Sequence, residues 1–255
     1  MTVTPIIDVN AYVGDWPFRP LRHRSPAAMR RALQEAGITR AVVSPLAAIF
    51  RQECTSANEE LIRALRRRGE FFIPAPALNP AYPGWEGDLE AAIAAGAPGV
   101  RLFPNYHAYS LDELGARAVV ERAAAAGIVV FVSLRMQDER HHHPRMMVPA
   151  VPLEEITGLA RTVPEARIVV CMGRYAEAEA LLAAGNVWLD LSGVQGPVGC
   201  VELLAERFGA DRLLMGTGTP LQYPLPAVAK IHASELPQAE RGKILGGSAA
   251  SLLRL

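Results

Sequence analysis

The chain has 255 residues, 50% of them hydrophobic and 20% charged, a composition typical of a globular protein with a large core. Its 26 basic and 26 acidic residues balance, so no net charge favours nucleic acid or an anionic membrane as a partner. No apolar stretch approaches the ~20 residues of a membrane span, residues 1–9 lack a signal-peptide pattern, and the three cysteines form no motif, which predicts a cytoplasmic protein.

Short apolar runs without polar alternation recur along the chain and predict strands that are buried on both faces. Helical patterns separate these runs, and several of the helices are expected to end at a glycine, as the first does at Gly37 after starting at Ser25 and Pro26. The predicted strands are Ile6–Val9, Ala41–Ser44, Phe71–Leu78, Val100–Phe103, Val129–Leu134, Ile168–Met172, Val187–Leu191 and Leu213–Met215. The other predicted helices include Ala57–Arg68, Asp88–Ala95, Gly115–Ala126, Leu153–Thr162, Ala176–Ala184 and Val198–Phe208.

Strict alternation of eight strands with helices predicts an α/β fold, a (β/α)8 TIM barrel that forms a single domain over residues 1–255. A doubly wound open sheet would show the same alternation, but no Gly-x-Gly-x-x-Gly follows the first strand. The tail, Gln238–Leu255, is expected to form two short helices that close the barrel.

Polar side chains follow the fourth and fifth predicted strands more densely than anywhere else in the chain. Active sites of such barrels lie at the C-terminal strand ends, so we expect one shared cavity there. The residues expected to open onto it are Asn10, Asn79, Arg101, Arg135, Asp190 and Thr217.

The chain resembles the amidohydrolase superfamily, in the amidohydrolase-related branch that includes decarboxylases and a lactonase. The resemblance rests on Ile7–Tyr12 after the first strand, Gly99–Leu102, Ile168–Gly173 and Arg212–Pro220. It implies a (β/α)8 barrel, hydrolase chemistry and, in many members, a bound zinc or other divalent ion.

The positions where the family places its metal ligands hold other residues here. Asn10 and Tyr12 replace the first two histidines, and Ser133 and Met172 stand where two later histidines are usual. Gly218 replaces the aspartate. These are poor donors for a divalent ion, so no metal ligand and no cofactor are expected.

The run His141–His143 offers an alternative zinc site, perhaps together with His107. In an extended segment His141 and His143 would share one side. No supporting Cys or Glu-x-x-His spacing accompanies the run, which favours a solvated loop held by hydrogen bonds.

The remaining candidates for chemistry are general acid–base groups and anion-binding groups. His107, Asp138 and Glu139 are the predicted proton-transfer residues. The predicted substrate-binding residues, which would hold a carboxylate or a developing oxyanion, are Asn10, Arg101, Asn105 and Arg135.

The sequence therefore predicts a metal-independent hydrolase, lactonase-like, or a decarboxylase that acts on a small carboxylate-bearing molecule. One alternative is a catalytically silent binding or assembly protein that kept the fold. Another is a phosphate-ligand enzyme that uses the glycine-rich turns Leu191–Gly199 and Gly216–Gly218. A homodimer or other homo-oligomer is expected from the frequency of such assemblies.

Overall fold

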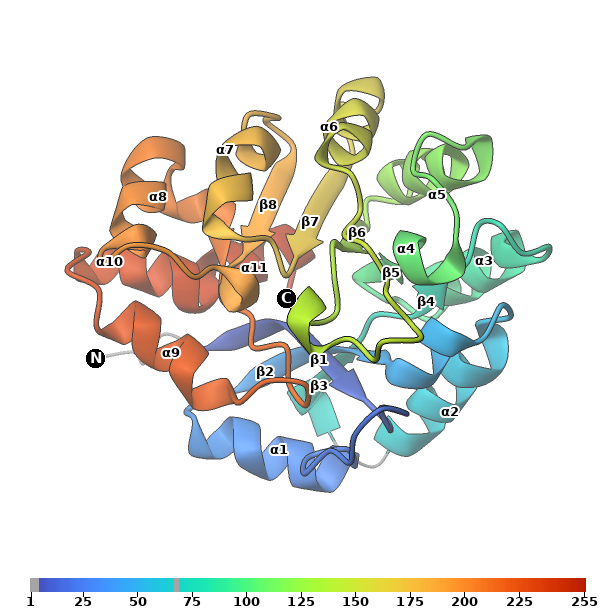
Figure 1. The fold of residues 1–255 in the computed structure, drawn as a ribbon, viewed down its shortest axis with the longest axis horizontal. Helices are drawn as coiled ribbons and strands as arrows, with labels where there is room; N and C mark the ends of the chain where they lie inside the picture. The colour runs from blue at the N-terminus through green and yellow to red at the C-terminus, as the bar shows by residue number, and fades with distance from the viewer. Residues whose placement is uncertain (1–4, 67–68) are drawn as a thin grey trace.

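A closed parallel barrel surrounded by helices forms the protein in the computed structural model, which describes residues 5–66 and 69–255 (Figure 1). Within these residues the strands form two sheets, of order β1-β2-β3 and β4-β5-β6-β7-β8-β9, and every pairing is parallel. The strands are β1 Ile7–Val13, β2 Arg40–Pro45, β3 Phe72–Pro74, β4 Ala77–Leu78, β5 Gly99–Leu102, β6 Val129–Ser133, β7 Arg167–Cys171, β8 Val187–Asp190 and β9 Leu213–Leu214.

The two sheets join into one barrel through backbone hydrogen bonds at both seams. At the first seam the Ala75 amide donates to Val43 and the Arg101 amide donates to Pro76, at 2.9 and 2.8 Å. At the second seam the Val9 amide donates to Met215 at 3.0 Å. The barrel is therefore closed, and the predicted (β/α)8 fold is confirmed.

The third predicted strand, Phe71–Leu78, is divided into β3 and β4. Pro74 and Pro76 lack amide donors, so the sheet ladder is interrupted between them. The buried side chain of Asn58 bridges the break, because its amide group both accepts from the Ala77 nitrogen and donates to the Ala77 oxygen, at 2.8 and 2.9 Å.

Helices follow the strands in the predicted order. Ser25 caps the first helix with its hydroxyl, and Gly37 follows its end at φ +84°. Predicted positions 67 and 68 of the second helix lie outside the described residues. The helices are α1 Pro26–Glu35, α2 Thr55–Leu65, α3 Trp85–Ala94, α4 Pro104–His107, α5 Leu114–Ala125, α6 Leu153–Thr162, α7 Tyr175–Leu182, α8 Cys200–Phe208, α9 Pro224–His232, α10 Gln238–Gly242 and α11 Ser248–Leu253.

Short helical turns complete the connections. They are η1 Leu46–Phe50, η2 Gly69–Phe71, η3 Glu139–His141, η4 Leu191–Gly193, η5 Ala210–Arg212 and, between α10 and α11, the π-type turn η6 Lys243–Gly247. The tail thus forms two short helices, as predicted, with η6 between them. Its Met215–Ile244 backbone hydrogen bond, of 3.0 Å, ties it to the end of β9.

The inside of the barrel changes from apolar to polar along its axis. A cluster that includes Ile7, Val42 and Phe131 fills the apolar part. Polar side chains that are fully buried fill the C-terminal part, and they come from β1, β2, β5, β6, β8 and the turn after β9: Asp8, Asn10, Ser44, Arg101, Ser133, Asp190 and Thr217. Hydrogen bonds from Arg101 join Asn10 and Ser44, and Asn10 donates to Asp190, so side chains from β1, β2, β5 and β8 form one connected polar layer.

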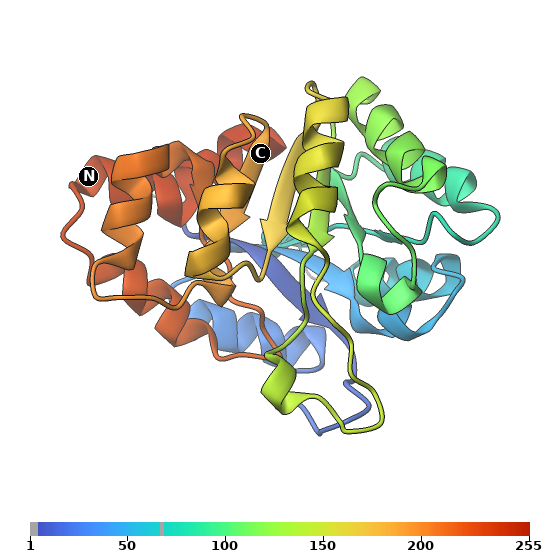
Figure 2. The ribbon, with the colours of Figure 1, turned by 45° about the horizontal axis from the view of Figure 1, so that its top comes forward.

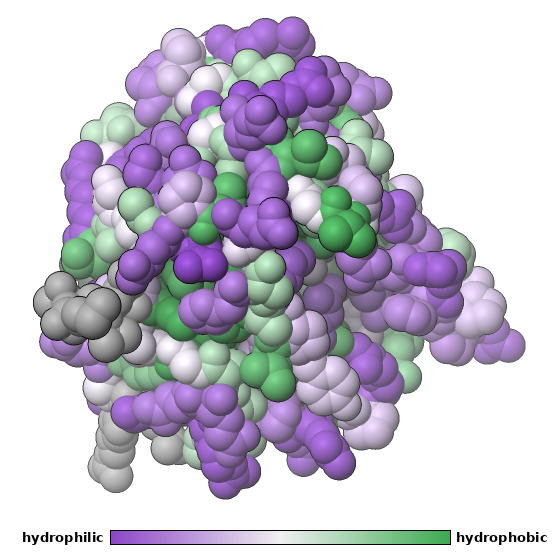
Figure 3. Space-filling view, turned by 90° about the vertical axis from the view of Figure 1, so that its left-hand side faces the viewer, coloured by the Kyte–Doolittle hydropathy of each residue, from purple (hydrophilic) through white to green (hydrophobic). Residues whose placement is uncertain are grey.

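The surface around the barrel is mixed. The face shown in Figure 3 is largely hydrophilic, and its apolar side chains form small separate areas. None of the helices in the described part of the chain is both long and apolar enough to cross a bilayer.

The loop after β6, residues 134–152, stands out from the body beside the loop after β1, residues 14–24 (Figure 2). The two loops touch where Phe18 and His143 stack, with ring centroids 5.9 Å apart. The projecting loop carries η3 and forms one side of the barrel mouth.

Candidate functional site

Arg101 at the end of β5 places a fully buried guanidinium inside the C-terminal part of the barrel. Its Nε donates to Ser44 Oγ at 2.8 Å, and its Nη1 donates to Asn10 Oδ1 and Tyr12 Oη at 2.9 and 3.0 Å. Its Nη2 donates to the Val9 carbonyl at 3.2 Å. The cation is therefore held by neutral acceptors, since no direct carboxylate hydrogen bond to it is present in the described residues.

Aromatic rings and a thiol complete the surroundings of this cation. The guanidinium carbon lies 4.9 Å from the centroid of the Tyr12 ring and 5.0 Å from that of Phe131, which gives a cation–π contribution on each side. The Cys171 sulfur lies 3.3 Å from Nη1, and burial raises the pKa of this thiol to about 12. Cys171 is thus a protonated core residue.

Two buried carboxylates flank the same interior. Asp8 accepts hydrogen bonds from the Asn10 amide, the Thr217 amide and the Thr217 hydroxyl, at 2.9, 3.0 and 2.6 Å. Asp190 accepts from the Ser192 and Met172 amides and from Asn10 Nδ2, at 2.7, 3.1 and 2.8 Å. Burial raises the pKa of both groups, to about 6 for Asp8.

These carboxylates explain the glycine-rich turns that suggested a phosphate site. The backbone amides of Thr217 and Ser192, which a phosphate would need, already donate to Asp8 and Asp190. Gly216 packs so closely that a Cβ there would lie 2.0 Å from Asp190 Oδ1. Gly193 packs in the same way against the Met172 and Gly173 backbone, and Gly196 against the Tyr175 ring, so close packing accounts for these glycines and the geometry does not support the phosphate alternative.

Met172 forms the floor that separates this interior from the barrel mouth. Its φ is +64°, a left-handed conformation that is uncommon for a side chain of this size. Asp190 holds its amide from the interior, and Arg135 Nη1 donates to its carbonyl at 2.8 Å from the mouth. The buried layer thereby fixes the position of the outer one.

The outer layer encloses a cavity of about 470 Å³ at the C-terminal ends of β6, β7 and β8, within the size range of small-molecule sites. It is lined by three arginines, two carboxylates, two glutamines and the Met172 floor. The lining residues are Arg135, Asp138, Glu139, Arg140, Met172, Arg174, Gly193, Gln195 and Gln222.

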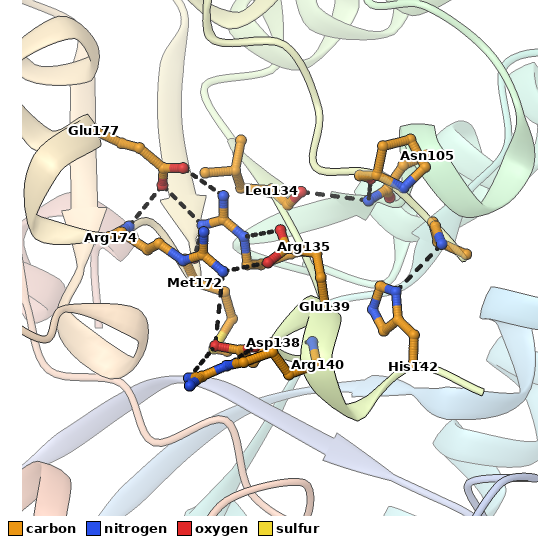
Figure 4. A network of polar contacts seen from close by, with 12 residues as sticks. Asn105, Leu134, Arg135, Asp138, Glu139, Arg140, His142, Met172, Arg174 and Glu177 are labelled. Carbon is orange, nitrogen blue, oxygen red and sulfur yellow. Dashed lines mark hydrogen bonds and ion pairs between the residues drawn. The ribbon is translucent and has the colours of Figure 1, made fainter. Parts of the chain in front are cut away.

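The guanidinium of Arg135 is buried and fixed by Glu177, as Figure 4 shows. Its Nη1 and Nη2 donate to the two Glu177 oxygens at 2.8 and 2.5 Å, a bidentate pair. Glu177 also accepts from the Arg174 amide at 2.7 Å at the start of α7. Although partial burial opposes it, hydrogen bonds from Arg135 and the Arg174 amide lower the pKa of Glu177.

The loop after β6 supplies two more ion pairs. Asp138 Oδ1 and Oδ2 accept from Arg140 at 2.8 and 2.9 Å, and Arg174 donates to Glu139. Hydrogen bonds from Arg140 lower the pKa of Asp138, and a hydrogen bond from Arg174 lowers that of Glu139 although burial opposes it. Both carboxylates are therefore ionised at neutral pH.

The structure gathers only some of the predicted site residues. Arg135, Asp138 and Glu139 line the cavity. Asn10 and Arg101 are buried below its floor, and Thr217 and Asp190 share that layer. Of the six residues expected to open onto one cavity, Arg135 alone is in the lining. Asn79 lies elsewhere, where its side chain hydrogen-bonds the Gln52 carbonyl and the Ala81 amide.

His107 and Asn105 lie outside the lining as well. His107 Nε2 lies 2.8 Å from the Ala48 carbonyl in a largely buried setting, and burial lowers the pKa of the imidazole. Asn105 Nδ2 donates to the carbonyls of Leu134 and Pro149 at 3.3 and 2.9 Å and so braces the loop after β6. Neither arrangement supports the predicted catalytic or substrate-binding role.

The histidine run has a structural role in this loop. His142 Nδ1 accepts from the Val148 amide at 3.3 Å, and His143 Nδ1 accepts from the Arg145 amide at 3.2 Å. In Figure 4, His142 and Asn105 lie away from the ionic cluster. Within residues 5–66 and 69–255 no three His, Cys, Asp or Glu side chains group as metal ligands.

Sequence reasoning missed Glu177, Gln195 and Gln222. Only Glu177 carried a signal, because it stands three residues after Arg174 in the first helical turn that follows a strand, the capping-box position. The two glutamines lie in loops after β8 and β9, where no pattern marked them.

Replacing Arg101 with methionine tests the buried cation. Loss of the guanidinium leaves the acceptors on Asn10, Ser44 and Val9 without their donor, so we expect the free energy of unfolding to fall by about 3 kcal/mol. Denaturant unfolding measures this change. Arg117→Met, which removes an exposed pair with Glu121, is the control and should cost less than ~1 kcal/mol. Equal losses in the two variants would contradict the assignment.

Asp8→Asn tests the buried carboxylate through pH. Because the folded pKa of Asp8 is raised, its protonated form favours folding below the unfolded pKa, and this stabilisation is lost as pH rises through about 6. Relative to the Asp8→Asn variant, wild type should therefore lose stability on the order of 2 kcal/mol between about pH 4 and about pH 7.5. Urea unfolding at both pH values checks this. A parallel pH dependence in the two proteins would contradict it.

Solved structures of similar shape include several decarboxylases of aromatic acids. A 5-carboxyvanillate decarboxylase from Sphingomonas paucimobilis has a TM-score of 0.79 at 16% identity, with 99% of this chain and 100% of that chain covered. A 2,6-dihydroxybenzoate decarboxylase from Rhizobium has a TM-score of 0.77 at 15% identity, with 99% of each chain covered. A dihydroxybenzoic acid decarboxylase from Polaromonas sp. JS666 has a TM-score of 0.78 at 18% identity, with 99% and 98% covered. At these identities the likeness establishes the fold.

The prediction that no cofactor is involved is corrected by these neighbours. The Polaromonas enzyme was solved with bound manganese, as was a 5-carboxyvanillate decarboxylase, so metal dependence occurs among the structural relatives. The buried layer of this chain does not fit such an ion: Asn10, Tyr12 and Ser133 are neutral donors, and the Arg101 guanidinium lies among them.

The family assignment rests on the whole length of the chain. Among curated protein sequences none matches significantly. The family model described as Amidohydrolase matches residues 10–255, which include every strand from the middle of β1 onward and the cavity at the barrel mouth. The chain belongs to the amidohydrolase family.

Proposed function

We propose that the chain is an amidohydrolase-related enzyme, a decarboxylase or a lactonase-like hydrolase, that acts on a small carboxylate-bearing molecule. The observation that carries this proposal is the cavity at the C-terminal barrel face, where three arginines and two carboxylates converge over Met172. Active sites of (β/α)8 barrels occupy this face. The cavity volume of about 470 Å³ suits a small molecule.

The charge of the cavity favours an anionic ligand. Arg135, Arg140 and Arg174 carry three positive charges, and Asp138 and Glu139 carry two negative ones, so the lining has a net charge of +1 (3 − 2). A guanidinium binds a carboxylate through paired hydrogen bonds, which gives both affinity and orientation.

The ionised carboxylates limit the proton chemistry. Because the pKa values of Asp138 and Glu139 are lowered, these groups accept protons and are not proton donors at neutral pH. In hydrolysis, one of them would take a proton from water as the water oxygen attacks the carbonyl carbon, and would return it to the leaving alkoxide. In decarboxylation, the bond between the carboxylate and the rest of the substrate breaks, carbon dioxide leaves, and the substrate carbon that carried the carboxylate takes up a proton from solvent.

The arginines would act on either reaction by holding the substrate. Arg135 is rigid because Glu177 and the Met172 carbonyl fix it, so a carboxylate bound beside it would be oriented with little loss of side-chain freedom. Arg174 is partly exposed and reaches the same cavity from the start of α7. The solved neighbours, which are named as decarboxylases of hydroxylated aromatic acids, suggest the first compounds to test.

A turnover screen tests the proposal. Purified protein is incubated with 2,6-dihydroxybenzoate, 5-carboxyvanillate and small lactones that carry a carboxylate, each with and without added Mn²⁺. Mass spectrometry separates loss of carbon dioxide from addition of water. We expect turnover of at least one compound, and we expect Arg174→Gln to lower kcat/KM by about tenfold, mainly through KM, because one carboxylate-binding cation is lost.

The matched control is Arg207→Gln, which removes an exposed arginine paired with Glu179 outside the cavity. Its kcat/KM should equal that of wild type. Binding of these compounds without turnover of any would contradict the enzyme and favour the silent binding protein. If the Arg174→Gln variant were as active as wild type, the active site would have to lie outside this cavity.

A further inference from the structure

One buried hydrogen-bond donor in the cavity has no acceptor. Within the described residues, Nε of Arg135 is inaccessible to solvent and makes no hydrogen bond, although Nη1 and Nη2 of the same guanidinium donate to Glu177 and Nη1 also donates to the Met172 carbonyl. The Arg135 side chain is 5% exposed. A buried charged N–H group without a hydrogen-bond acceptor costs free energy, and an acceptor atom of a ligand would recover that free energy.

The carboxylate of Glu139 covers this donor from the cavity side. Its Oε1 lies 3.7 Å from Arg135 Nε, beyond hydrogen-bond distance, while its Oε2 accepts from Arg174 Nη2 (Figure 4). A single carboxylate thus lies between two guanidinium groups. It satisfies Arg174 and leaves Arg135 Nε unsatisfied.

We propose that Glu139 occupies the carboxylate subsite of the cavity as an internal stand-in, and that a ligand carboxylate displaces it to bind Arg135 Nε and Arg174 Nη2 together. Exchange of one carboxylate for another leaves the charge of the cavity unchanged. A neutral ligand has no such exchange available, because it would replace the charged hydrogen-bond acceptor that Glu139 gives Arg174 with an uncharged group. The subsite therefore selects monoanionic carboxylates, with the remainder of the ligand facing Gln195 and Gln222.

The loop that carries Glu139 is built to allow this exchange. Its base is fixed, since Met136 is buried and Val151 donates to the Leu134 carbonyl at 3.0 Å. Its tip carries η3, which contains no buried residue, and the Glu139 side chain is 37% exposed. Displacement of Glu139 therefore needs movement of η3 alone.

Asp138 is not equivalent to Glu139. Both of its oxygens are engaged by Arg140, and the nearest Arg174 nitrogen lies 3.7 Å away. Asp138 also caps η3 by accepting from the Arg140 amide at 3.0 Å. It holds the turn together, whereas Glu139 holds the turn against the cavity.

The inference deepens the proposed function and relies on it for the use of the cavity, but direct binding tests it without turnover. Isothermal titration calorimetry with benzoate compares wild type, Glu139→Gln and Arg174→Gln. Removing the internal competitor should lower the benzoate Kd about fivefold in Glu139→Gln. Loss of Arg174 should raise it about tenfold.

Two controls separate this mechanism from a general charge effect. Glu179→Gln makes the same change of charge on the outer surface, where Glu179 pairs with Arg207, and should leave the benzoate Kd unchanged. Benzamide, which lacks the charge, should bind no more tightly to Glu139→Gln than to wild type.

An unchanged or raised benzoate Kd in Glu139→Gln would overturn the inference, as would equal tightening in Glu179→Gln or no benzoate binding by either wild type or Glu139→Gln. Tightening by Glu139→Gln without turnover of any test compound would uphold the subsite and refute the proposed enzyme.

Discussion

The buried guanidinium of Arg101 is the constraint around which the C-terminal end of the barrel is arranged. A charge removed from water must be surrounded by hydrogen-bond acceptors. Here β1 supplies Asn10 and the Tyr12 hydroxyl, and β2 supplies Ser44. The ring centroids of Tyr12 and Phe131 lie 4.9 and 5.0 Å from the guanidinium carbon. Asn10 then links the cation to Asp190 through its other amide atom, at 2.8 Å. The C-terminal interior of the barrel is thereby filled with protein atoms, and the polar groups that line the cavity lie one layer further out.

That outer layer depends on the inner one through a short chain of contacts. Asp190 fixes the Met172 amide, the Met172 carbonyl fixes Arg135, and Glu177 completes the hold on Arg135 from α7. Gly216 is required in this arrangement because no Cβ fits against Asp190. The cavity is rigid on this side and adjustable on the side of the projecting loop.

Most of the fold was predictable because strand and helix patterns are local. Leu153–Thr162 was predicted with its observed bounds, and the barrel followed from the alternation of eight strands with helices. The break between β3 and β4 was missed although Pro74 and Pro76 lie in the sequence, because the apolar run continues through them.

The site was less predictable, since strand ends give the level of a side chain but not its direction. Asn10 and Arg101 lie near the C-terminal strand ends, as expected, but their side chains point into the barrel, where they are fully buried and hydrogen-bonded to each other. Asn105 and His107, close in sequence to Arg101, turn with α4 towards the loops and bind backbone carbonyls. Arg135, Asp138 and Glu139 were found because they follow a strand directly, whereas Glu177 reaches Arg135 from the neighbouring unit and no local pattern pairs them.

The central claim is that Arg101 fills the inner site and that ligands bind in the outer cavity. A crystal structure with bound 4-bromobenzoate tests it directly, because the anomalous signal of bromine gives the position of the ligand without relying on how its electron density is fitted. We expect the carboxylate between Arg135 and Arg174, with Glu139 displaced and the bromine towards Gln195 and Gln222. Bromine in the barrel interior beside Tyr12 and Ser133, or a bound carboxylate with Glu139 still in place, would contradict it.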